Sequence, residues 1–498
     1  ECQDAYADMN PASAGYVSAF RESILDKVAG SGVSDENVIV PWYNLHKVLA
    51  GLIDIYTFVD DEELAEGALG IAENFGEYVF NRCSRLTDNQ VMLRTEYGGM
   101  NEALYELYDI TGNTHFKAAA EYFDEVALFN SLAANQDVLN GKHANTTIPK
   151  LIGALKRYTV MMDNEDYYDA LTETEQADLE KYKTAAVNFW DIVVEHHTYI
   201  TGGNSQSEHF HEADKLYYDA TKSDYDGSST CETCNTYNML KLSRELYKLT
   251  KDKKYMDYYE NTYINAILSS QNPETGTTMY FQPMAPGYNK VFNRPHDEFW
   301  CCTGTGMENF SKLRDTMYFT EQSDVYVNMY FSNTFAFEKQ NLKLTQEANI
   351  PNEDEVTVSV AALDGSEVAA GTNLKFRIPD WVAGEASILV NGEKLAAGSE
   401  ENGYVTVADV KAGDVIKLTF PMEVRAYATQ DNQAFAAFRY GPVALSAALG
   451  TNNIEASSPN GILVRVGTKD SSCQTVITVQ DMTVDEWLSN VKENLVRI

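Results

Sequence analysis

Two short segments of the sequence concentrate side chains that can bind a metal ion or act as nucleophiles. The first runs Cys231-Glu232-Thr233-Cys234, and the second contains the adjacent Cys301 and Cys302. Four of the seven cysteines of the chain therefore lie in two tight pairs. Thiolates and carboxylates bind zinc, which takes four ligands, and an activated thiolate can also attack a carbon centre.

Each pair lies just before or at the start of a stretch whose apolar residues recur at helical spacing. Met239 and Leu240 follow the first pair, and Phe310 and Met317 follow the second. The free N–H groups and the positive dipole end at a helix N-terminus stabilise a thiolate. Two such helix starts facing each other would gather several thiolates, and their mutual repulsion favours a cation between them.

The spacing alone leaves four interpretations of these cysteines open. The pairs can form a closed structural zinc site with four cysteines, disulfides, buried unpaired thiols, or a catalytic zinc or thiolate. The odd number of cysteines in a long chain argues against a disulfide scaffold. The two segments offer one ligand more than zinc needs, in the set Cys231, Glu232, Cys234, Cys301 and Cys302. Packing or surface roles are expected for the isolated Cys2, Cys83 and Cys473.

A third group of chemically competent residues follows a turn at Gly202-Gly203-Asn204. Here Glu208 is followed by His209, Phe210 and His211. A carboxylate beside two histidines can bind a metal ion or act as an acid and base. The same residues can also form a solvated loop without a chemical role.

The composition is that of a globular protein with several domains. The chain has 498 residues, of which 44% are hydrophobic and 22% are charged. Its 74 acidic and 38 basic residues give a formal net charge of -36, which argues against a nucleic-acid or acidic-membrane partner. No apolar run approaches the roughly 18 residues that a membrane-spanning helix needs. The chain starts at Glu1 without a Met or a signal peptide, and we interpret it as a trimmed or mature form.

The pattern of apolar residues changes from helical to strand-like near residue 322. Before this point, the helical period is clear over 44–53, 100–108 and 239–249. Sequential helix pairs in this number can close into an α/α toroid or continue as a solenoid. After it, alternating segments predict a β-sandwich, at 325–331, 356–360, 375–378, 388–390 and 415–420. We therefore predict two domains, 1–322 and 323–498.

The cysteine segments and several others also form recognisable motifs. Cys-Cys-Thr-Gly-Thr at 301–305 is a double-cysteine motif, and Glu-Thr-Cys-Asn at 232–235 is a Glu-x-Cys motif upstream of it. In this highly specific combination the chain resembles the β-L-arabinofuranosidases of glycoside hydrolase families 127 and 146. Gly-Gly-Asn-Ser at 202–205 with Glu-His-Phe at 208–210 is more similar to family 146. The resemblance covers roughly residues 40 to 450 and includes segments 42–47, 97–104, 143–149, 378–381 and 440–442.

The resemblance implies an N-terminal (α/α)6 barrel followed by a β-sandwich. It also implies a bound Zn²⁺ ion, whose ligands are Glu232, Cys234, Cys301 and Cys302. Cys301 would be the nucleophile and Glu208 the acid/base. The family positions that hold the furanose ring match His143, Glu260 and Tyr280. Cys231 is then an additional cysteine, and Glu232 takes its place as a ligand.

We therefore expect an exo-acting retaining glycoside hydrolase that releases terminal β-L-arabinofuranose from plant-derived glycans. Zinc ligation deprotonates a thiol, and attack by sulfur followed by attack by water gives net retention. The expected partner is a carbohydrate substrate, with no nucleic acid and no membrane span, and the oligomeric state is open. Two alternatives stand beside this expectation: a related furanosidase acting on another plant cell-wall sugar, and a non-catalytic carbohydrate-binding protein with a structural four-cysteine zinc site.

The two ends of the chain and its localisation are less defined. Residues 452–461 are polar and predict a loop, and the last forty residues mix strand character with a helical stretch at 484–496. The family usually has more residues before the first barrel helix, which is compatible with a fragment of a longer enzyme. Acidity and polysaccharide use slightly favour export, whereas reactive thiols favour a reducing setting or protection by zinc, so localisation is open.

Overall fold

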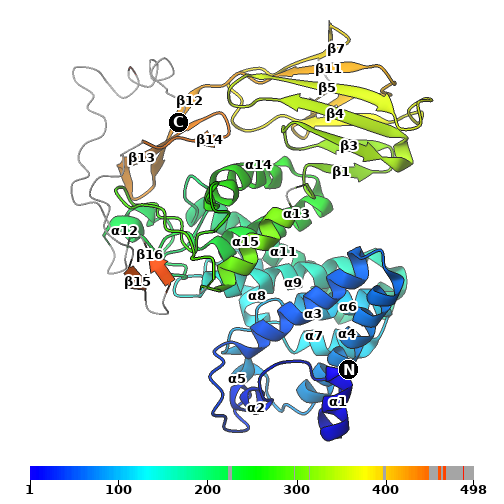
Figure 1. Cartoon of the computed structure of the whole chain (residues 1–498), viewed down its shortest axis with the longest axis vertical. Coiled ribbons are helices and arrows are strands. Elements are labelled where there is room, and N and C mark those ends of the chain that lie inside the picture. The colour runs from blue at the N-terminus through cyan, green and yellow to red at the C-terminus, as the bar shows by residue number, and fades with distance from the viewer. Residues whose placement is uncertain are drawn as a thin grey trace. The chain divides into compact units, whose positions relative to one another are not determined.

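Helices make up the N-terminal part of the protein and strands follow, as the sequence predicts (Figure 1). The structure is a computed structural model, and it describes residues 1–222, 227–296, 298–312, 314–395, 400–447, 458–460, 464–466 and 486. Two compact units are present. The first comprises Glu1–Glu195 and His209–His211, and the second comprises His196–Glu208 and Glu212–Ile498.

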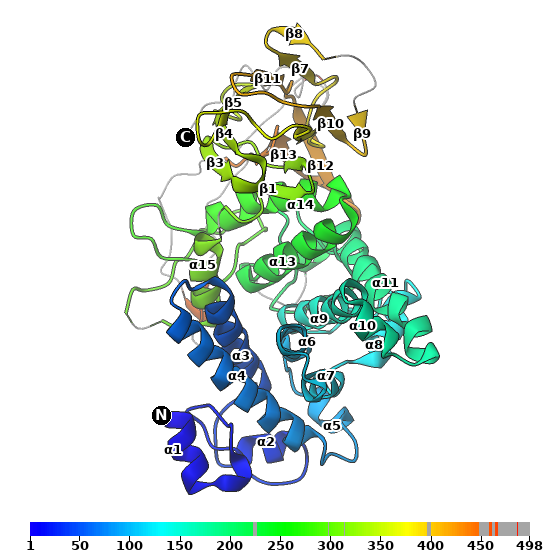
Figure 2. The same cartoon turned by 90° about the vertical axis from the view of Figure 1, so that its right-hand side faces the viewer.

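The first unit is helical. Its described helices are α1 (Cys2–Met9), a 3-10 turn (Pro11–Ser13), α2 (Ser23–Val28), α3 (Pro41–Phe58), α4 (Glu62–Cys83), α5 (Gln90–Leu93), α6 (Met100–Thr111), α7 (Thr114–Glu121), α8 (Val126–Ala133), α9 (Ala144–Asp163), α10 (Glu165–Asp169) and α11 (Glu173–His196). Helices α3 and α4 lie side by side, and α6 packs against α3, α7 and α9 (Figure 2). The helices predicted at 44–53 and 100–108 are confirmed within α3 and α6.

Local side chains explain several of these helix boundaries. Asp61 accepts a hydrogen bond from the amide of Leu64 at the start of α4, and Asn113 accepts one from the amide of His115 at the start of α7. Helix α6 ends at Gly112, which has a φ of 69°. Glycine adopts this left-handed conformation at low cost, so it terminates the helix.

The helices of the second unit carry the cysteine pairs. They are α12 (Leu216–Thr221), α13 (Thr233–Thr250), α14 (Lys253–Thr262), a π-helical turn (Tyr263–Ile267), a 3-10 turn (Leu268–Ser270) and α15 (Cys301–Ser311). Helix α13 packs against α14, α15 and the π-helical turn. The helix predicted at 239–249 is confirmed within α13.

The described strands of the second unit form two large and two small sheets. They are β1 (Tyr318–Glu321), β2 (Asp324–Val327), β3 (Asn333–Phe337), β4 (Leu342–Ala348), β5 (Glu355–Ala362), β6 (Asn373–Arg377), β7 (Ser387–Val390), β8 (Glu393–Lys394), β9 (Glu400–Glu401), β10 (Tyr404–Val407), β11 (Val415–Thr419), β12 (Val424–Thr429), β13 (Asn432–Tyr440), β14 (Val443–Ala444), β15 (Ser458–Asn460) and β16 (Val464–Val466). The large sheets have the orders β1-β2-β6-β10-β9 and β3-β4-β5-β11-β7-β8. The small sheets are β12-β13-β14 and β15-β16.

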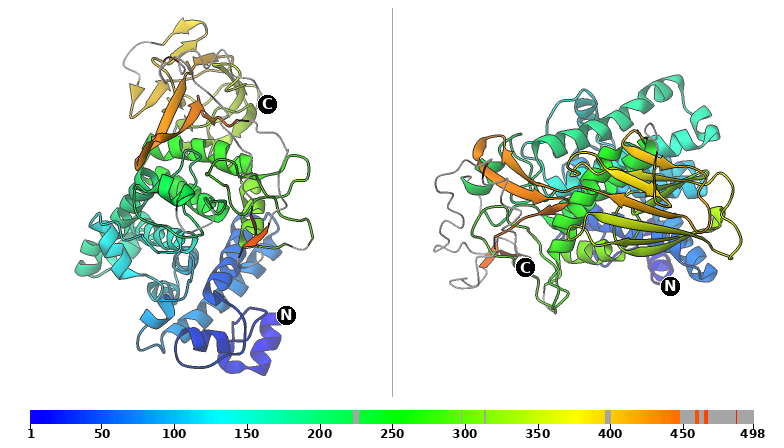
Figure 3. Two further views of the ribbon diagram at one scale, coloured as in Figure 1. Left: turned by 90° about the vertical axis from the view of Figure 1, so that its left-hand side faces the viewer. Right: turned by 90° about the horizontal axis from the view of Figure 1, so that it is seen from above.

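Each large sheet buries one face. In β4 and β5 the buried residues alternate with exposed ones, as Leu342 and Leu344 show in β4. In the other sheet Leu374 and Phe376 of β6 are fully buried. Apart from β2 and β6, which run parallel, the neighbouring strands of these sheets are antiparallel. This alternation is that of sheets with one face packed on a core, and the yellow strands in Figure 3 belong to this part of the second unit.

A buried ionic cluster joins α14 to β6. The guanidinium of Arg377 is fully buried, contacts Asp257, and places Nη2 2.8 Å from Oε2 of Glu260. The indole Nε1 of Trp381 donates to the same oxygen at 2.8 Å. A buried arginine is stable only when its charge is paired in this way.

Two predictions at the C-terminus have a different outcome. The loop predicted at 452–461 is wrong at Ser458–Asn460, because these residues pair with Val464–Val466 as two short strands. The helical stretch at 484–496 lies outside the described residues, except for residue 486, and Cys473 lies outside them as well. Every helix in the described ranges is too short or too polar to span a lipid bilayer.

Candidate active site and metal site

Three extended segments of the second unit lie side by side and bring together parts of the chain that are distant in sequence. Antiparallel bridges pair Gln206 with Thr230 and Glu232 with Phe281. The middle segment continues into α13, since Glu232 is the residue before its first turn. The loop that carries Glu208, the start of α13 and the segment around residue 280 are therefore fixed to one another by backbone hydrogen bonds.

The loop before α13 contains an unusual number of strained residues. Positive φ angles occur at non-glycine positions Ser205 (79°), Ser207 (46°), Glu208 (68°) and Cys231 (54°). Each costs about 1–3 kcal/mol and persists only when the surrounding structure enforces it. Such strain clusters at functional sites, and here it fixes the direction of the Glu208 side chain.

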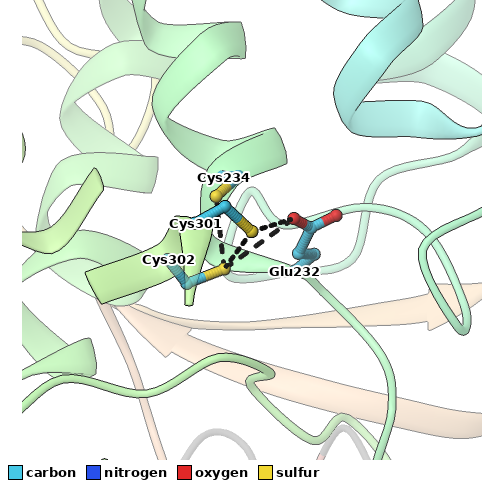
Figure 4. Close-up of side chains that lie close together, drawn as sticks. All are labelled: Glu232, Cys234, Cys301 and Cys302. Carbon is cyan, nitrogen blue, oxygen red and sulfur yellow. Dashed lines mark hydrogen bonds between the residues drawn. The ribbon is translucent and has the colours of Figure 1, made fainter. Parts of the chain in front are cut away.

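The cysteine pairs lie in the first turns of two helices, as the sequence predicts. Cys234 belongs to the first turn of α13, and Cys301 and Cys302 begin α15. The Sγ atoms of Cys234 and Cys302 are 3.2 Å apart, and those of Cys301 and Cys302 are 3.9 Å apart. Figure 4 shows the three thiols together with the carboxylate of Glu232. Two helix N-termini with their positive dipole ends therefore meet at this group.

This group of four side chains fits a metal ion. Its ligand atoms all lie within 4.8 Å of one another. The Oε1 atom of Glu232 is 3.8 Å from Sγ of Cys301 and 3.7 Å from Sγ of Cys302. A tetrahedral site with metal–sulfur bonds of about 2.3 Å has edges of about 3.8 Å, and of these four distances the Cys234–Cys302 one is clearly shorter. The Oε2 atom of buried Glu232 has no hydrogen-bond partner among the described residues, a cost that a bound cation removes.

The ionisation of these groups differs sharply within the cluster. Burial raises the pKa of the Glu232 carboxyl, and those of the Cys234 and Cys302 thiols, well above their usual values. In contrast, hydrogen bonds from Cys234 and then Cys302 lower the pKa of the Cys301 thiol to about 3. Cys301 is therefore the thiol that ionises most readily, and the thiolate is the nucleophilic form of cysteine.

Cys301 also has the only exposed thiol of this four-residue group. Its Sγ atom lies 3.6 Å from the hydroxyl of Tyr280. That hydroxyl donates a short hydrogen bond to Oε1 of Glu208. The Tyr280 hydroxyl thus lies between the Cys301 thiol and the Glu208 carboxylate. A nucleophile with an acid/base nearby is what covalent catalysis requires.

Cys231 lies outside the cluster. Its side chain is buried in a separate apolar group with Tyr199 and Ala220, and burial raises the pKa of its thiol. It also packs closely on Gly203, where an added Cβ would lie 2.7 Å from the sulfur. A closed zinc site with four cysteines needs this thiol, so the geometry favours Glu232 as the fourth ligand.

Comparison with known proteins agrees with this geometry. The profile of the β-L-arabinofuranosidase GH127 catalytic domain matches residues 1–315, and that of the GH127 middle domain matches residues 324–422. The chain belongs to the GH127 β-L-arabinofuranosidase family. The non-reducing end β-L-arabinofuranosidase of Bifidobacterium longum subsp. longum is 25% identical to this chain over a 251-residue alignment, which covers 48% of this chain and 37% of that protein. The chain therefore matches little more than a third of the length of that relative.

Solved GH127 structures share the fold. A GH127 β-arabinofuranosidase superposes with a TM-score of 0.62 at 21% identity, over 84% of this chain and 66% of the other. The GH127 β-L-arabinofuranosidase of Geobacillus stearothermophilus T6 gives a TM-score of 0.53 at 18% identity, over 89% and 85% of the chains. The predicted fold class is confirmed: a helical, α/α-barrel-like GH127 catalytic domain precedes a β-sheet middle domain.

The three predicted sugar-binding residues of this GH127 chain differ in their surroundings. Glu260 is buried and bound to Arg377 and Trp381. His143 belongs to the first unit, where its ring centroid lies 5.1 Å from that of His209. Their roles in holding the furanose ring stay predictions, whereas Tyr280 lies directly beside Cys301.

Sequence reasoning gave no role to two residues that support the GH127 site. The hydroxyl of Thr305 lies 3.0 Å from Sγ of Cys234. Thr305 follows Cys302 by three positions, so helical periodicity could have placed it on the same side of α15. The amide of Asn235 donates to the hydroxyl of Ser205 at 2.7 Å, which ties the start of α13 to the strained loop.

Proposed function

We propose that this protein is an exo-acting retaining glycoside hydrolase that releases terminal β-L-arabinofuranose from plant-derived glycans. Membership of the GH127 family supports the reaction class. The substrate is inferred from the family and from the printed name of the Bifidobacterium relative. The observation that carries the proposal is the position of the exposed Cys301 thiol, with the Tyr280 hydroxyl between it and Glu208.

Cys301 is the proposed nucleophile. Its sulfur forms a bond to the anomeric carbon while the bond to the leaving oxygen breaks, and Glu208 donates a proton to that oxygen. Glu208 then removes a proton from water, which displaces the sulfur from the anomeric carbon. Two displacements at one carbon give net retention of configuration.

Tyr280 is the proposed link between these two groups. Its hydroxyl donates to Glu208, so it fixes the direction of the carboxylate. The oxygen of the same hydroxyl lies 3.6 Å from Sγ of Cys301 and can accept a hydrogen bond from the thiol, so Tyr280 holds the nucleophile and the acid/base in a fixed relation. The furanose ring of the substrate is proposed to contact Tyr280, Glu260 and His143.

Zinc is the proposed metal, held by Glu232, Cys234, Cys301 and Cys302. Three thiols and one carboxylate are a ligand set that zinc accepts in tetrahedral geometry. When bound, zinc offsets the negative charge of the ligands and keeps the thiols deprotonated. The buried, unpartnered oxygen of Glu232 supports a cation at this point.

Two finer assignments also belong to this proposal. The segments 202–205 and 208–210 favour family 146 over family 127 within this group of enzymes. We place the domain boundary near residue 322, with domains 1–322 and 323–498; α15 ends at Ser311 and β1 begins at Tyr318.

The test is the release of L-arabinose from an aryl β-L-arabinofuranoside by the zinc-loaded protein under reducing conditions. Cys301→Ser and Glu208→Gln are measured beside the parent, with Cys231→Ser as the matched cysteine control. We expect turnover by the parent and the control, loss of turnover in the other two variants, and a β-configured first product by NMR. If the parent hydrolyses only a different furanoside, that furanoside replaces β-L-arabinofuranoside as the proposed substrate. If Cys301→Ser is as active as the parent, Cys301 is not the nucleophile.

A further inference from the structure

A cavity lies on α13, beyond the turn that carries Cys234. It has a volume of about 90 Å³, and its lining comes from α13, α14, the π-helical turn, α15 and residues just after α15. This is several times the roughly 10–15 Å³ that a cavity needs to hold one water molecule, so the cavity can accept part of a larger ligand. The described lining residues include none of the four cysteine-cluster side chains, so the cavity is separate from the proposed active site.

The floor of this cavity is aromatic and apolar. Tyr259 and Tyr263 are buried, and their rings stack with centroids 6.2 Å apart and planes 20° apart. Buried Leu240 and Ile267 extend the same surface. Tyr263 is the first residue of the π-helical turn, and such turns occur frequently at functional sites. Aromatic and aliphatic side chains that line a cavity suit the apolar parts of a sugar ring.

Asn309 contributes an amide without a partner to this cavity. The residue is only 8% exposed and lines the cavity wall. In the part of the chain that the structure describes, no group forms a hydrogen bond with its side chain. Buried amides are almost always hydrogen-bonded, so this one is available to hydroxyl groups of a ligand.

The charge of the lining is opposite to that of the whole protein. Lys241, Arg244 and Lys312 outnumber Glu245 and Asp315 by one, although the chain has 38 basic against 74 acidic residues. Glu245 and Asp315 both contact Arg244, at 2.9 and 3.4 Å. Lys312 has no carboxylate within 4.0 Å among the described residues, and its Nζ atom lies 3.4 Å from the hydroxyl of Tyr237. Lys312 can therefore pair with an anionic group of a ligand.

We propose that this cavity binds a hexuronate residue of an acidic oligosaccharide. The ring lies on Tyr259 and Tyr263, the carboxylate pairs with Lys312, and the hydroxyl groups bond to Asn309. An isolated phosphate would leave the aromatic floor unused, and a neutral sugar would leave Lys312 unpaired. The site goes beyond the proposed hydrolysis, because it does not depend on which bond the enzyme cleaves.

The test is isothermal titration calorimetry of the full chain with an oligogalacturonate, an oligosaccharide that contains glucuronate, and a neutral galacto-oligosaccharide that contains no arabinose and is therefore not a substrate of the proposed active site. We expect at least one hexuronate to bind and the neutral sugar not to bind. Lys312→Met should weaken hexuronate binding about tenfold, the loss of one charge-assisted hydrogen bond. Lys312→Arg should retain binding, and Lys394→Met, which removes a surface cation from β8, should not change it.

Each outcome decides the inference. Binding of one hexuronate identifies which acidic sugar the site takes, and binding of both supports the shared carboxylate chemistry. The proposal is wrong if neither hexuronate binds the parent, if Lys312→Met binds as tightly as Lys394→Met, or if the neutral sugar binds equally well. Thermal unfolding of each variant shows that a loss of binding does not come from a loss of fold.

Discussion

The hydroxyl of Tyr280 donates a hydrogen bond to the Oε1 atom of Glu208. The two residues are 72 positions apart in the sequence, and the strained loop and the paired segment at residue 280 bring them together. The same hydroxyl lies 3.6 Å from Sγ of Cys301, so one side chain contacts both groups of the proposed reaction. A substitution of Tyr280 is therefore the most direct way to distinguish an effect on the chemical step from an effect on substrate binding.

Tyr280→Phe should lower kcat about a hundredfold, the cost of losing one well-placed donor, while the KM changes little. The aromatic ring remains in place, so the thermal unfolding midpoint should be unchanged. Steady-state kinetics on an aryl β-L-arabinofuranoside check this. A rise in KM with an unaltered kcat would instead assign Tyr280 to uniform substrate binding.

Cys234→Ser should lose the bound metal, whereas Cys231→Ser should keep it. Cys234 lies within the four-residue cluster, and Cys231 packs in a separate apolar group. Removal of a direct ligand should weaken metal binding by more than about a hundredfold, which is the upper cost of removing a supporting residue. Elemental analysis of the dialysed variants measures the metal content. Loss of metal from Cys231→Ser would show that the ligand set is wrong.

Metal loading should rise with pH and fall on acidification. Burial raises the metal-free pKa of Glu232, Cys234 and Cys302, so these groups hold protons that a metal ion must displace. Protons are therefore released on loading, and a lower pH shifts the balance towards the metal-free form. Proton release on titration with zinc in weakly buffered solution measures this. Loading without proton release would contradict the raised pKa values.

Gly202→Ala should destabilise the loop that leads to Glu208. Gly202 has a φ of 88°, and an added Cβ would lie 1.9 Å from Oγ1 of Thr262. The clash and the left-handed backbone together should cost about 1–3 kcal/mol of unfolding free energy. Gly51→Ala is the control, because Gly51 lies within α3 with no atom within 4 Å of an added Cβ. Denaturant unfolding should show no loss, or a small gain, for the control.

Arg377→Met should destabilise the second unit by about 3–5 kcal/mol, because it leaves the buried carboxylate of Glu260 without its cation. Lys417→Met, on β11, should cost less than about 1 kcal/mol, because its ion pair with Glu355 is exposed to solvent. Urea unfolding of the two variants compares these costs. Equal stability of the two variants would mean that the cluster between α14 and β6 contributes little.

Much of the local structure was predictable from the sequence. The helices at 44–53, 100–108 and 239–249 and the strands at 356–360 and 415–420 follow from the spacing of apolar residues, which each segment carries by itself. The same spacing of apolar residues predicts that the cysteine pairs lie at helix starts. The short strand at Ser458–Asn460 was missed, because Ser-Pro-Asn is typical of a loop, whereas its partner Val464–Val466 lies in the last forty residues, where strand character was expected.

Tertiary structure decided which side chains meet. The spacing of residues treated Cys231 and Glu232 as equal candidates, and only the family resemblance favoured Glu232. In the folded chain the strand-like pairing of residue 232 with residue 281 turns neighbouring side chains to opposite sides. Glu232 therefore enters the cysteine cluster, and Cys231 enters the apolar group.

The sequence by itself determined the family, the order of helices and strands, and the residues capable of the chemistry, because these depend on short-range patterns and motifs. Only the tertiary structure placed Tyr280 between Glu208 and Cys301, and Glu260 against Arg377 and Trp381. These contacts join residues that are far apart in sequence. They depend on the packing of whole segments, and no local pattern of residues encodes that packing.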